Sequence, residues 1–413
     1  MAADQQSDGG SHSQGSSAIL AWYMSGQATW FASIGLQFVL FPYLVANVLN
    51  ETPARIGIAQ MSLSAPALLF MLLGGATADR GDPRTILFRV HLFAALPPLA
   101  LATALNAGLL SFEILVCYGL FMGTATAFAM PARDATLNLV ARGNIQQTVT
   151  LAMAVQQTAQ LLGMVIALFA ATIGAPLLFA GQSLVVLAGG LTARRLPRKK
   201  LDPNIVHPSR AKAMLDGLTY VRRSEILLPI VIAMFAIGVF FIGSFLVALP
   251  LLVRDFYHGG VVEIGTANIA FFGGMIAATI FLLRFGHVTR RGRAVILSLI
   301  VGALVVVGLT FEMPYWLFCV LCLIWGLGAG CVMTLSRTLV QEEADEAFRA
   351  RALSIFQLGF AGGSPLGALL MGFMAGYFGT HNAMWIPAVG MTLVLAWLMV
   401  KSRLWSLRAH HSD

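Results

Sequence analysis

Twelve long apolar stretches set the strongest limit on how this chain folds. Each stretch runs for about 20 residues without the regular polar and apolar alternation of a membrane β-strand. Hydrophobic residues make up 58% of the 413 residues and charged residues only 11%, whereas a soluble domain carries about 25% charge. Inside a bilayer, only helices and closed barrels satisfy the backbone polar groups. The sequence therefore predicts an all-α integral membrane protein.

The apolar stretches define the predicted organisation of the chain. The twelve predicted spans are residues 19–46, 56–78, 85–105, 109–131, 146–171, 176–194, 226–250, 262–284, 294–311, 314–336, 351–376 and 382–401. A hydrophilic stretch between spans six and seven predicts a cytoplasmic linker at 195–225. The predicted parts are a disordered cytoplasmic tail at 1–18, six-helix bundles at 19–194 and 226–401, and a second cytoplasmic tail at 402–413.

The basic residues predict the orientation of the chain. If the N-terminus is cytoplasmic, all but two of the 26 Lys and Arg residues fall in inner segments, and only Arg55 and Arg254 fall outside. Cytoplasmic loops of membrane proteins are enriched in Lys and Arg. We therefore expect both termini on the cytoplasmic side of a bacterial-type inner membrane. This distribution also accounts for the net charge of +8 without a nucleic-acid partner.

The two halves repeat features at the same offset in sequence. Arg133 and Arg337 each follow the fourth span of their half, and Gly163 and Gly367 each lie within the fifth span. Alternating-access transporters are built from internal repeats of this kind. The repetition predicts two pseudo-symmetric six-helix halves.

The loop after the second span carries a charged motif. Its sequence, "GGATADRGDPR" at residues 74–84, contains G-x-x-x-D-R-x-x-x-R. Together with twelve spans in two halves, this loop resembles the signature of the major facilitator superfamily. Asp82 stands where the family usually has Gly, and Pro83 stands where it usually has a basic residue. The resemblance implies the major facilitator fold and transport by alternating access.

We interpret the charged loop as part of a conformational latch. Asp79 is predicted at the cytoplasmic end of span two, where it would face the N-terminus of span eleven, whose unpaired amides carry partial positive charge. Neighbouring arginines would complete an ionic cluster with the end of span four. The predicted latch residues are Gly75, Asp79, Arg80, Arg84, Arg133 and Asp134. The alternative is that the arginines are ordinary anchors on the cytoplasmic side.

Two further segments narrow the resemblance. The stretches "AFAMPARDATLNLV" (127–140) and "MLDGLTYVRRSEILLPIV" (214–231) are similar to the branch of enterobactin-type siderophore exporters and macrolide-efflux proteins. Exporters of the superfamily often carry a Gly-Pro pair in span five, and Gly163 is followed here by Met164. The resemblance implies efflux, and the departure at Met164 puts the kink expected in span five in doubt.

Polar residues inside the spans are candidates for substrate contacts, because burying them in a bilayer costs free energy. Spans one, four, seven and ten line the central cavity in this superfamily, which favours Gln27, Gln37 and Ser244. Interhelical hydrogen bonding is the alternative for each glutamine. No carboxylate lies in the middle of a predicted span, and this favours a neutral or amphipathic substrate over a strongly cationic one.

Proton coupling requires a titratable group within or near a span. Glu113, at the outer start of span four, is the best carboxylate candidate, and His91 is the only histidine well inside a span. A structural hydrogen bond within the helix is the alternative for His91.

These features favour a proton-linked exporter of an amphipathic small molecule, such as a drug or a siderophore. We expect a monomer that needs no cofactor or metal. An uptake carrier or a lipid flippase of the same fold is the main alternative, since topology does not fix direction, and a non-transporting receptor or scaffold is a further one. The chain has no HExxH, GxSxG or P-loop motif, which argues against an enzyme or an ATP-driven pump.

Overall fold

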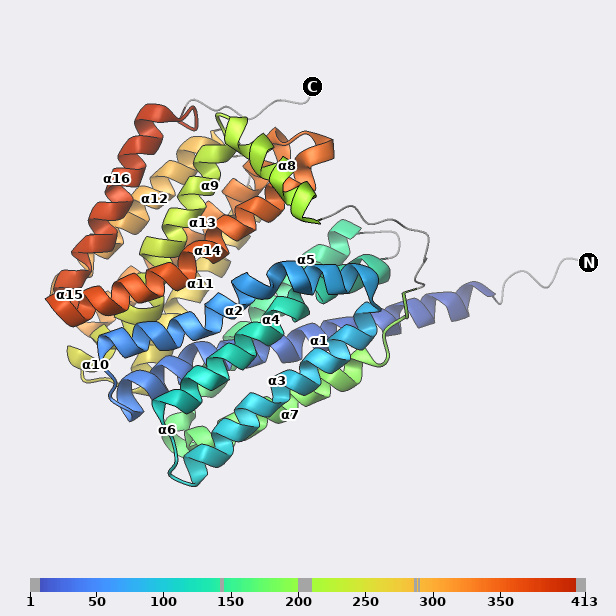
Figure 1. The fold of residues 1–413 in the computed structure, drawn as a ribbon, viewed down its shortest axis with the longest axis horizontal. Helices are drawn as coiled ribbons and strands as arrows, with labels where there is room; N and C mark the ends of the chain where they lie inside the picture. The colour runs from blue at the N-terminus through green and yellow to red at the C-terminus, as the bar shows by residue number, and fades with distance from the viewer. Residues whose placement is uncertain (1–7, 142–144, 200–209, 286–287, 289, 406–413) are drawn as a thin grey trace, which may run out of the picture. The chain divides into compact units, whose positions relative to one another are not determined.

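The computed structural model describes residues 8–141, 145–199, 210–285, 288 and 290–405 (Figure 1). All regular secondary structure in these ranges is helical. The first elements are α1 (Asp8–Tyr43), η1 (Leu44–Val48), α2 (Pro53–Arg80), α3 (Pro83–Asn106), α4 (Phe112–Val140), α5 (Ile145–Leu168), α6 (Ala170–Ile173) and α7 (Ala175–Ala193). The later elements are α8 (Arg210–Arg223), α9 (Leu227–Ala236), η2 (Ile237–Ile242), η3 (Ser244–Ala248), α10 (Leu249–Asp255), α11 (Val261–Phe285), α12 (Arg291–Gly308), α13 (Tyr315–Glu343), α14 (Glu346–Phe378), α15 (Thr380–Ala383) and α16 (Trp385–Lys401).

Twelve helical segments in the described ranges are long and apolar enough to cross a membrane, which confirms the predicted fold class. Most predicted boundaries lie within a few residues of the observed ones. Apart from the start of α1, the largest differences are at the C-terminal ends of α4 and α13, which continue to Val140 and Glu343. A hydropathy window detects the apolar run, whereas a helix that is already formed extends into polar sequence at little cost.

Part of the predicted N-terminal tail is helical. α1 begins at Asp8, so the helix covers residues 8–18, for which the sequence predicted disorder. Gly and Ser have lower helix propensity than Ala or Leu, but adding residues to an existing helix costs less than nucleating one. Residues 1–7 of this tail and residues 406–413 of the C-terminal tail lie outside the described residues.

The chain divides into two compact units. Unit 1 contains Met1–Leu40 and Leu69–Val206, and unit 2 contains Phe41–Leu68 and His207–Asp413. The segment Phe41–Leu68, which holds η1 and the first half of α2, therefore groups with the second half of the chain. In unit 2, a Cβ at Gly57 of α2 would lie 2.6 Å from the carbonyl oxygen of Ala368 on α14, so the two backbones are in close contact. The predicted six-helix bundles at 19–194 and 226–401 describe the repeat in the sequence, and their boundaries stay a prediction.

In unit 1, α1 and α5 cross with their backbones in contact. A Cβ at Gly163 of α5 would lie 2.0 Å from the carbonyl oxygen of Ala32, and a Cβ at Gly35 of α1 would lie 1.9 Å from that of Gln160. Only glycine allows this approach, because real Cβ atoms do not come within 3 Å of a neighbouring backbone. Close packing therefore accounts for the glycine that the sequence placed in the fifth span.

Unit 2 repeats this crossing between the π-helical segment η2 and α14. A Cβ at Gly367 would lie 2.2 Å from the carbonyl oxygen of Val239. An aromatic cluster is also buried in unit 2, with ring centroids of Phe245 and Phe271 4.3 Å apart and those of Phe245 and Trp325 6.0 Å apart. The same kind of glycine contact thus positions the first and fifth spans of each half.

The predicted linker contains a helix, α8, that packs within unit 2. The ring of Tyr220 stacks on Phe348 with centroids 4.5 Å apart, and its hydroxyl oxygen accepts a hydrogen bond from the amide of Asp345 at 3.0 Å. Residues 200–209 of the linker lie outside the described residues.

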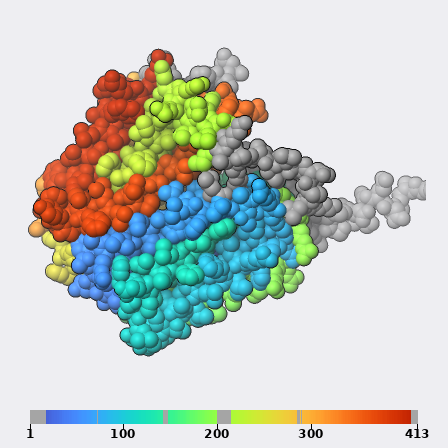
Figure 2. All heavy atoms as spheres, viewed as in Figure 1, coloured from blue at the N-terminus to red at the C-terminus, as the bar shows by residue number. Residues whose placement is uncertain are grey.

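Apolar side chains line the outer faces of the helices. On α16, exposed apolar residues recur with helical spacing, at Trp385, Val389, Leu393, Trp397 and Val400. Figure 2 shows α16 at the surface of unit 2 and α3 at the surface of unit 1. Leu92, Leu96 and Leu99 form the corresponding stripe on α3. Such stripes suit contact with lipid tails.

Candidate functional site

The charged loop after α2 is fixed to unit 1 by a residue that the sequence did not single out. The Nζ atom of Lys199 donates a hydrogen bond to the carbonyl oxygen of Asp79 at 3.1 Å, and its amide donates to Oδ1 of Asp82 at 3.2 Å. The other carboxylate oxygen of Asp82 accepts a bond from the Thr85 hydroxyl at 2.9 Å. Asp82, which replaces the usual glycine, thus joins the start of α3 to the segment after α7.

The predicted latch residues occupy different environments in unit 1. Gly75 is buried, Asp79 and Arg84 are half-buried, and Arg80 is exposed. The glycine that permits the close approach of α2 to α4 is Gly74, because a Cβ there would lie 2.1 Å from the carbonyl oxygen of Ala127. The latch itself stays a prediction.

Arg133 is buried, whereas the sequence placed it in an ionic cluster at the end of α4. Arg133 is 4% exposed, and its guanidinium carbon lies 5.0 Å from the ring centroid of Trp30 and 4.7 Å from that of Phe31. The next residue, Asp134, is exposed. Successive helix residues point about 100° apart, so the two side chains of this predicted pair face different surroundings.

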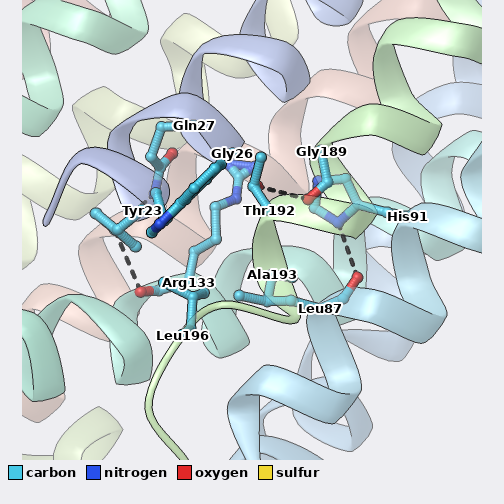
Figure 3. A pocket seen from close by; sticks show the side chains of 11 residues that line it. Tyr23, Gly26, Gln27, Leu87, His91, Arg133, Gly189, Thr192, Ala193 and Leu196 are labelled. Carbon is cyan, nitrogen blue, oxygen red and sulfur yellow. Dashed lines mark hydrogen bonds between the residues drawn. The ribbon is translucent and has the colours of Figure 1, made fainter. Parts of the chain in front are cut away.

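A small pocket in unit 1 brings together Arg133, His91 and Gln27, which the sequence assigned to three separate roles (Figure 3). Its walls come from α1, α3, α4 and α7 and from the residues after α7. The lining residues are Trp22, Tyr23, Gly26, Gln27, Leu87, His91, Arg133, Gly189, Thr192, Ala193 and Leu196. The pocket volume is about 10 Å³, room for one water-sized group.

Hydrogen bonds fix two of the polar side chains in this pocket. Gln27 donates from Nε2 to the Tyr23 hydroxyl at 2.6 Å, and Nδ1 of His91 lies 2.8 Å from the carbonyl oxygen of Leu87. A carbonyl only accepts, so Nδ1 carries the proton and Nε2 of neutral His91 is an acceptor. Nε2 of His91 has no hydrogen-bond partner in the structure.

Gln37 belongs to a separate network in unit 1. The Tyr118 hydroxyl lies 3.1 Å from Oε1 of Gln37 and 3.2 Å from Nε2 of Gln182, and Nε2 of Gln182 also donates to the Ser33 hydroxyl at 2.9 Å. These bonds join α1, α4 and α7, as expected if Gln37 makes interhelical hydrogen bonds. Tyr118 and Gln182 were not among the predicted site residues, because their only signal in the sequence is a polar group at a helix centre.

Of the two remaining predicted site residues, Ser244 is buried and Glu113 is exposed. Ser244, in η3 of unit 2, is 1% exposed, and its hydroxyl donates to the carbonyl oxygen of Phe240 at 2.6 Å. Glu113 is exposed in the first turn of α4, next to the Ser111 side chain that caps this helix. A carboxylate in the first turn of a helix is stabilised by the partial positive charge there.

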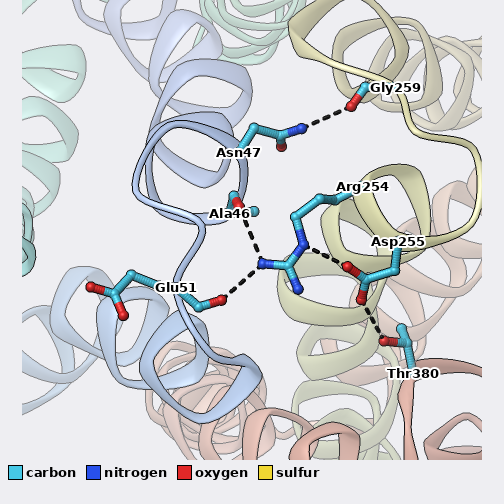
Figure 4. Close-up of polar contacts among 7 residues, drawn as sticks. All are labelled: Ala46, Asn47, Glu51, Arg254, Asp255, Gly259 and Thr380. Carbon is cyan, nitrogen blue, oxygen red and sulfur yellow. Dashed lines mark hydrogen bonds and ion pairs between the residues drawn. The ribbon is translucent and has the colours of Figure 1, made fainter.

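A second polar cluster lies within unit 2 at the predicted outer end (Figure 4). Nη1 of Arg254 donates to the carbonyl oxygens of Ala46 at 3.1 Å and Glu51 at 2.8 Å, and its Nε lies 2.6 Å from Oδ1 of Asp255. Oδ2 of Asp255 accepts a bond from Thr380 at 3.1 Å. The arginine thus holds the turn between η1 and α2 against α10.

The sequence contained a signal for this cluster, because Arg254 is one of two basic residues predicted on the outer side. In the same turn region, Asn47 donates to the carbonyl oxygen of Gly259 at 2.8 Å. Burial raises the pKa of nearby Tyr257 to about 12, so this phenol is neutral at physiological pH and adds no charge.

Solved transporters share this fold. The nucleoside transporter NupG aligns with a TM-score of 0.70 at 15% identity, over 94% of this chain and 98% of that one. A D-xylose-proton symporter aligns with a TM-score of 0.71 at 14% identity, over 94% of this chain and 97% of that one. Together with the twelve membrane-capable helices, these matches define an integral membrane protein with the major facilitator fold.

The family is shown by the sequence as well. The family model described as transmembrane secretion effector matches residues 20–413, and the chain belongs to this family of major facilitator transporters, which are not enzymes. The enterobactin exporter EntS of Shigella flexneri is 24% identical over 82% of this chain and 81% of that protein. Macrolide efflux protein A of Streptococcus pyogenes is 23% identical over 45% of this chain, and the match spans only 44% of that relative's length.

Proposed function

We propose that this transporter exports an amphipathic small molecule by proton-linked alternating access. The observation that carries the proposal is the arrangement of polar side chains in unit 1, where Gln27, His91 and Arg133 line one pocket between apolar helices. The pocket combines apolar walls with hydrogen-bonding groups, the two kinds of contact that an amphipathic molecule makes, and it would have to widen during the transport cycle to admit one. The substrate is small, and the protein works in a bacterial-type inner membrane as a monomer with both termini in the cytoplasm.

Two relatives support export as the direction. One is named an enterobactin exporter and the other a macrolide efflux protein, and both names describe movement out of the cell. An uptake carrier is the second candidate, because a D-xylose-proton symporter has the same fold. Lipid flipping is a further outcome of the experiment below.

Transport into inverted membrane vesicles tests this proposal. Vesicles carrying the protein would be given a panel of siderophores and lipophilic dyes, with and without an imposed pH gradient. Export predicts gradient-dependent accumulation of one class of compound in the inverted vesicles. Accumulation only in right-side-out vesicles would favour uptake, and movement of a labelled lipid between leaflets without solute accumulation would favour a flippase.

The latch hypothesis predicts a transport defect without a folding defect. Replacing Asp79 with asparagine removes the charge and keeps the size of a half-buried side chain at the end of α2. We expect the Asp79→Asn variant to transport about tenfold more slowly while its thermal stability in detergent stays within about 0.5 kcal/mol of the parent. The control is Glu312→Gln, which neutralises an exposed carboxylate outside the predicted latch and should transport as the parent does. Equal transport by Asp79→Asn and the parent would remove the latch.

Proton coupling through Glu113 makes a separate prediction. The Glu113→Gln variant keeps a polar group in the first turn of α4 but cannot exchange a proton near neutral pH. We expect this variant to lose the dependence of vesicle accumulation on the pH gradient while it still exchanges substrate across the membrane. If gradient dependence persists, the same measurement on His91→Gln tests the other candidate, and gradient dependence in both variants would contradict coupling at these residues.

A further inference from the structure

Arg133 is a buried cation whose charge is left without a hydrogen-bonding partner on one edge. Arg133 is 4% exposed, and both its Nε and its Nη2 lack hydrogen-bond partners. Nη1 lies 4.0 Å from the sulfur of Met130, a weak acceptor. Proteins pair buried charges, because removing an ion from water is costly unless another group replaces the lost hydration. The aromatic faces of Trp30 and Phe31 compensate only part of that loss.

The unpaired atoms form one edge of the guanidinium group. Nε–H and Nη2–H point in nearly the same direction, and this pair of donors matches the two oxygens of a carboxylate in a bidentate interaction. Figure 3 shows the Arg133 side chain extending from α4 toward Gly26 of α1, inside the pocket. None of the residues that line this pocket carries a carboxylate.

Further unpaired polar groups lie around the arginine. Trp30 Nε1 and His91 Nε2 are buried without partners, and the two rings meet edge to face with centroids 5.1 Å apart. Tyr23 and the exposed Asp134 lie close enough to Arg133 to interact with it electrostatically. The Tyr23 hydroxyl donates a bond at 3.4 Å to the Arg133 carbonyl oxygen, so it does not neutralise the guanidinium.

Among the described residues, the repeat counterpart of Arg133 is not buried. Arg337, the sequence counterpart of Arg133, is exposed at the end of α13 in unit 2. An anchor on the cytoplasmic side of the membrane requires only an exposed arginine of this kind. Burying the arginine costs free energy, and a ligand that replaces its missing partner would recover that cost.

We propose that Arg133 binds the carboxylate of an acidic amphipathic substrate. Nε and Nη2 donate to the two carboxylate oxygens, and the apolar part of the molecule extends out of the pocket. The pocket has room for one water-sized group in this structure, so binding requires it to widen as the transporter changes state. Calling this ligand a substrate rests on the proposed export function. Binding at Arg133 does not depend on the direction of transport or on its coupling.

Two fluorescent probes that differ only in charge test the site. Dansyl-phenylalanine carries a free carboxylate, and dansyl-phenylalaninamide has the same apolar body without the charge. We expect the purified wild-type protein in neutral detergent to bind the acid about tenfold more tightly than the amide, measured by fluorescence polarisation. The Arg133→Met variant should bind both probes equally, and Arg133→Lys should keep part of the preference because it keeps the charge. Arg337→Met is the matched control and should bind as the wild type does.

Stability measurements show whether the variant is folded and separate the possible outcomes. Arg133→Met removes an unpaired buried charge, so its melting temperature should equal or exceed that of the wild type and should no longer rise with the acid. Equal binding of acid and amide by the wild type, or an unchanged preference in Arg133→Met, would overturn the proposal. If sodium acetate displaced the probe as well as the acid itself does, the site would hold any small carboxylate and the substrate assignment would fail. Vesicles that accumulate only neutral compounds, despite acid binding at Arg133, would reject the substrate assignment and leave export standing.

Discussion

The Gly163→Ala variant is expected to lose most of its folded population, although the substitution adds only one methyl group. The new Cβ would lie 2.0 Å from the carbonyl oxygen of Ala32 and 3.0 Å from the amide nitrogen of Leu36. Both contacts are with backbone, which cannot move away as a flexible side chain can. Separating α1 from α5 would also break the contact at Gly35, so we expect a loss of about 3 kcal/mol or more. Size-exclusion chromatography and a melting curve in detergent measure it.

Gly181 provides the matched control in the same unit. A Cβ built on this α7 residue meets nothing within 4 Å. Because alanine favours a helix more than glycine does, Gly181→Ala should be neutral or stabilising by up to about 1 kcal/mol. Similar melting temperatures for the two variants would show that the α1–α5 crossing has room for a side chain.

The Arg254→Leu variant is expected to open the predicted outer end of unit 2 and to slow transport. The substitution removes two hydrogen bonds to the carbonyl oxygens of Ala46 and Glu51 and leaves Asp255 without its arginine partner. Hydrogen bonds from charged groups contribute about 1.5–3 kcal/mol each. Ala46 is fully buried, so a cysteine placed there in a cysteine-free protein reports the opening. We expect a membrane-impermeant maleimide to label Ala46→Cys at least about tenfold faster in the Arg254→Leu background.

Arg55 is the control for charge, because it is the other arginine predicted on the outer side. Its side chain is 49% exposed and pairs with Glu51, four residues earlier, at 2.9 Å. An exposed pair of this kind contributes less than about 1 kcal/mol. Arg55→Leu should therefore leave the labelling rate unchanged. Equal labelling in the Arg254→Leu and Arg55→Leu backgrounds would mean that Arg254 does not hold the turn between η1 and α2.

The fold was predictable from the sequence because the two features that determine it, apolar runs and glycines, are visible in short segments. Apolar runs of bilayer length give the helices, and glycines such as Gly163 and Gly367 mark where helices approach closely. The crossing partners of these glycines were not predictable, since Ala32 and Val239 carry no signal in the sequence. The packing of Phe41–Leu68 with the second half also had none, because contacts distant in sequence decide it.

The candidate site was predicted only in part. Gln27, His91 and Arg133 were each recognised as individual candidates, but no pattern in the sequence indicated that they line one pocket. Arg133 shows the limit most clearly, because its counterpart Arg337 has the same position in the repeat and the opposite exposure. Burial depends on the rotation of α4 against its neighbours, and a repeat in sequence does not determine that rotation.

The π-helical segments η2 and η3 give the seventh span an adjustable register. A π turn contains one more residue than an α turn, and such turns often lie at functional positions. If a π turn moved along the helix past a residue, that residue would advance by one position, a screw motion of about 100° and 1.5 Å. Ser244 begins η3. A shift of this kind would carry its hydroxyl to another face of the helix without breaking the span, so the seventh span can rotate its polar group while its ends stay where they are.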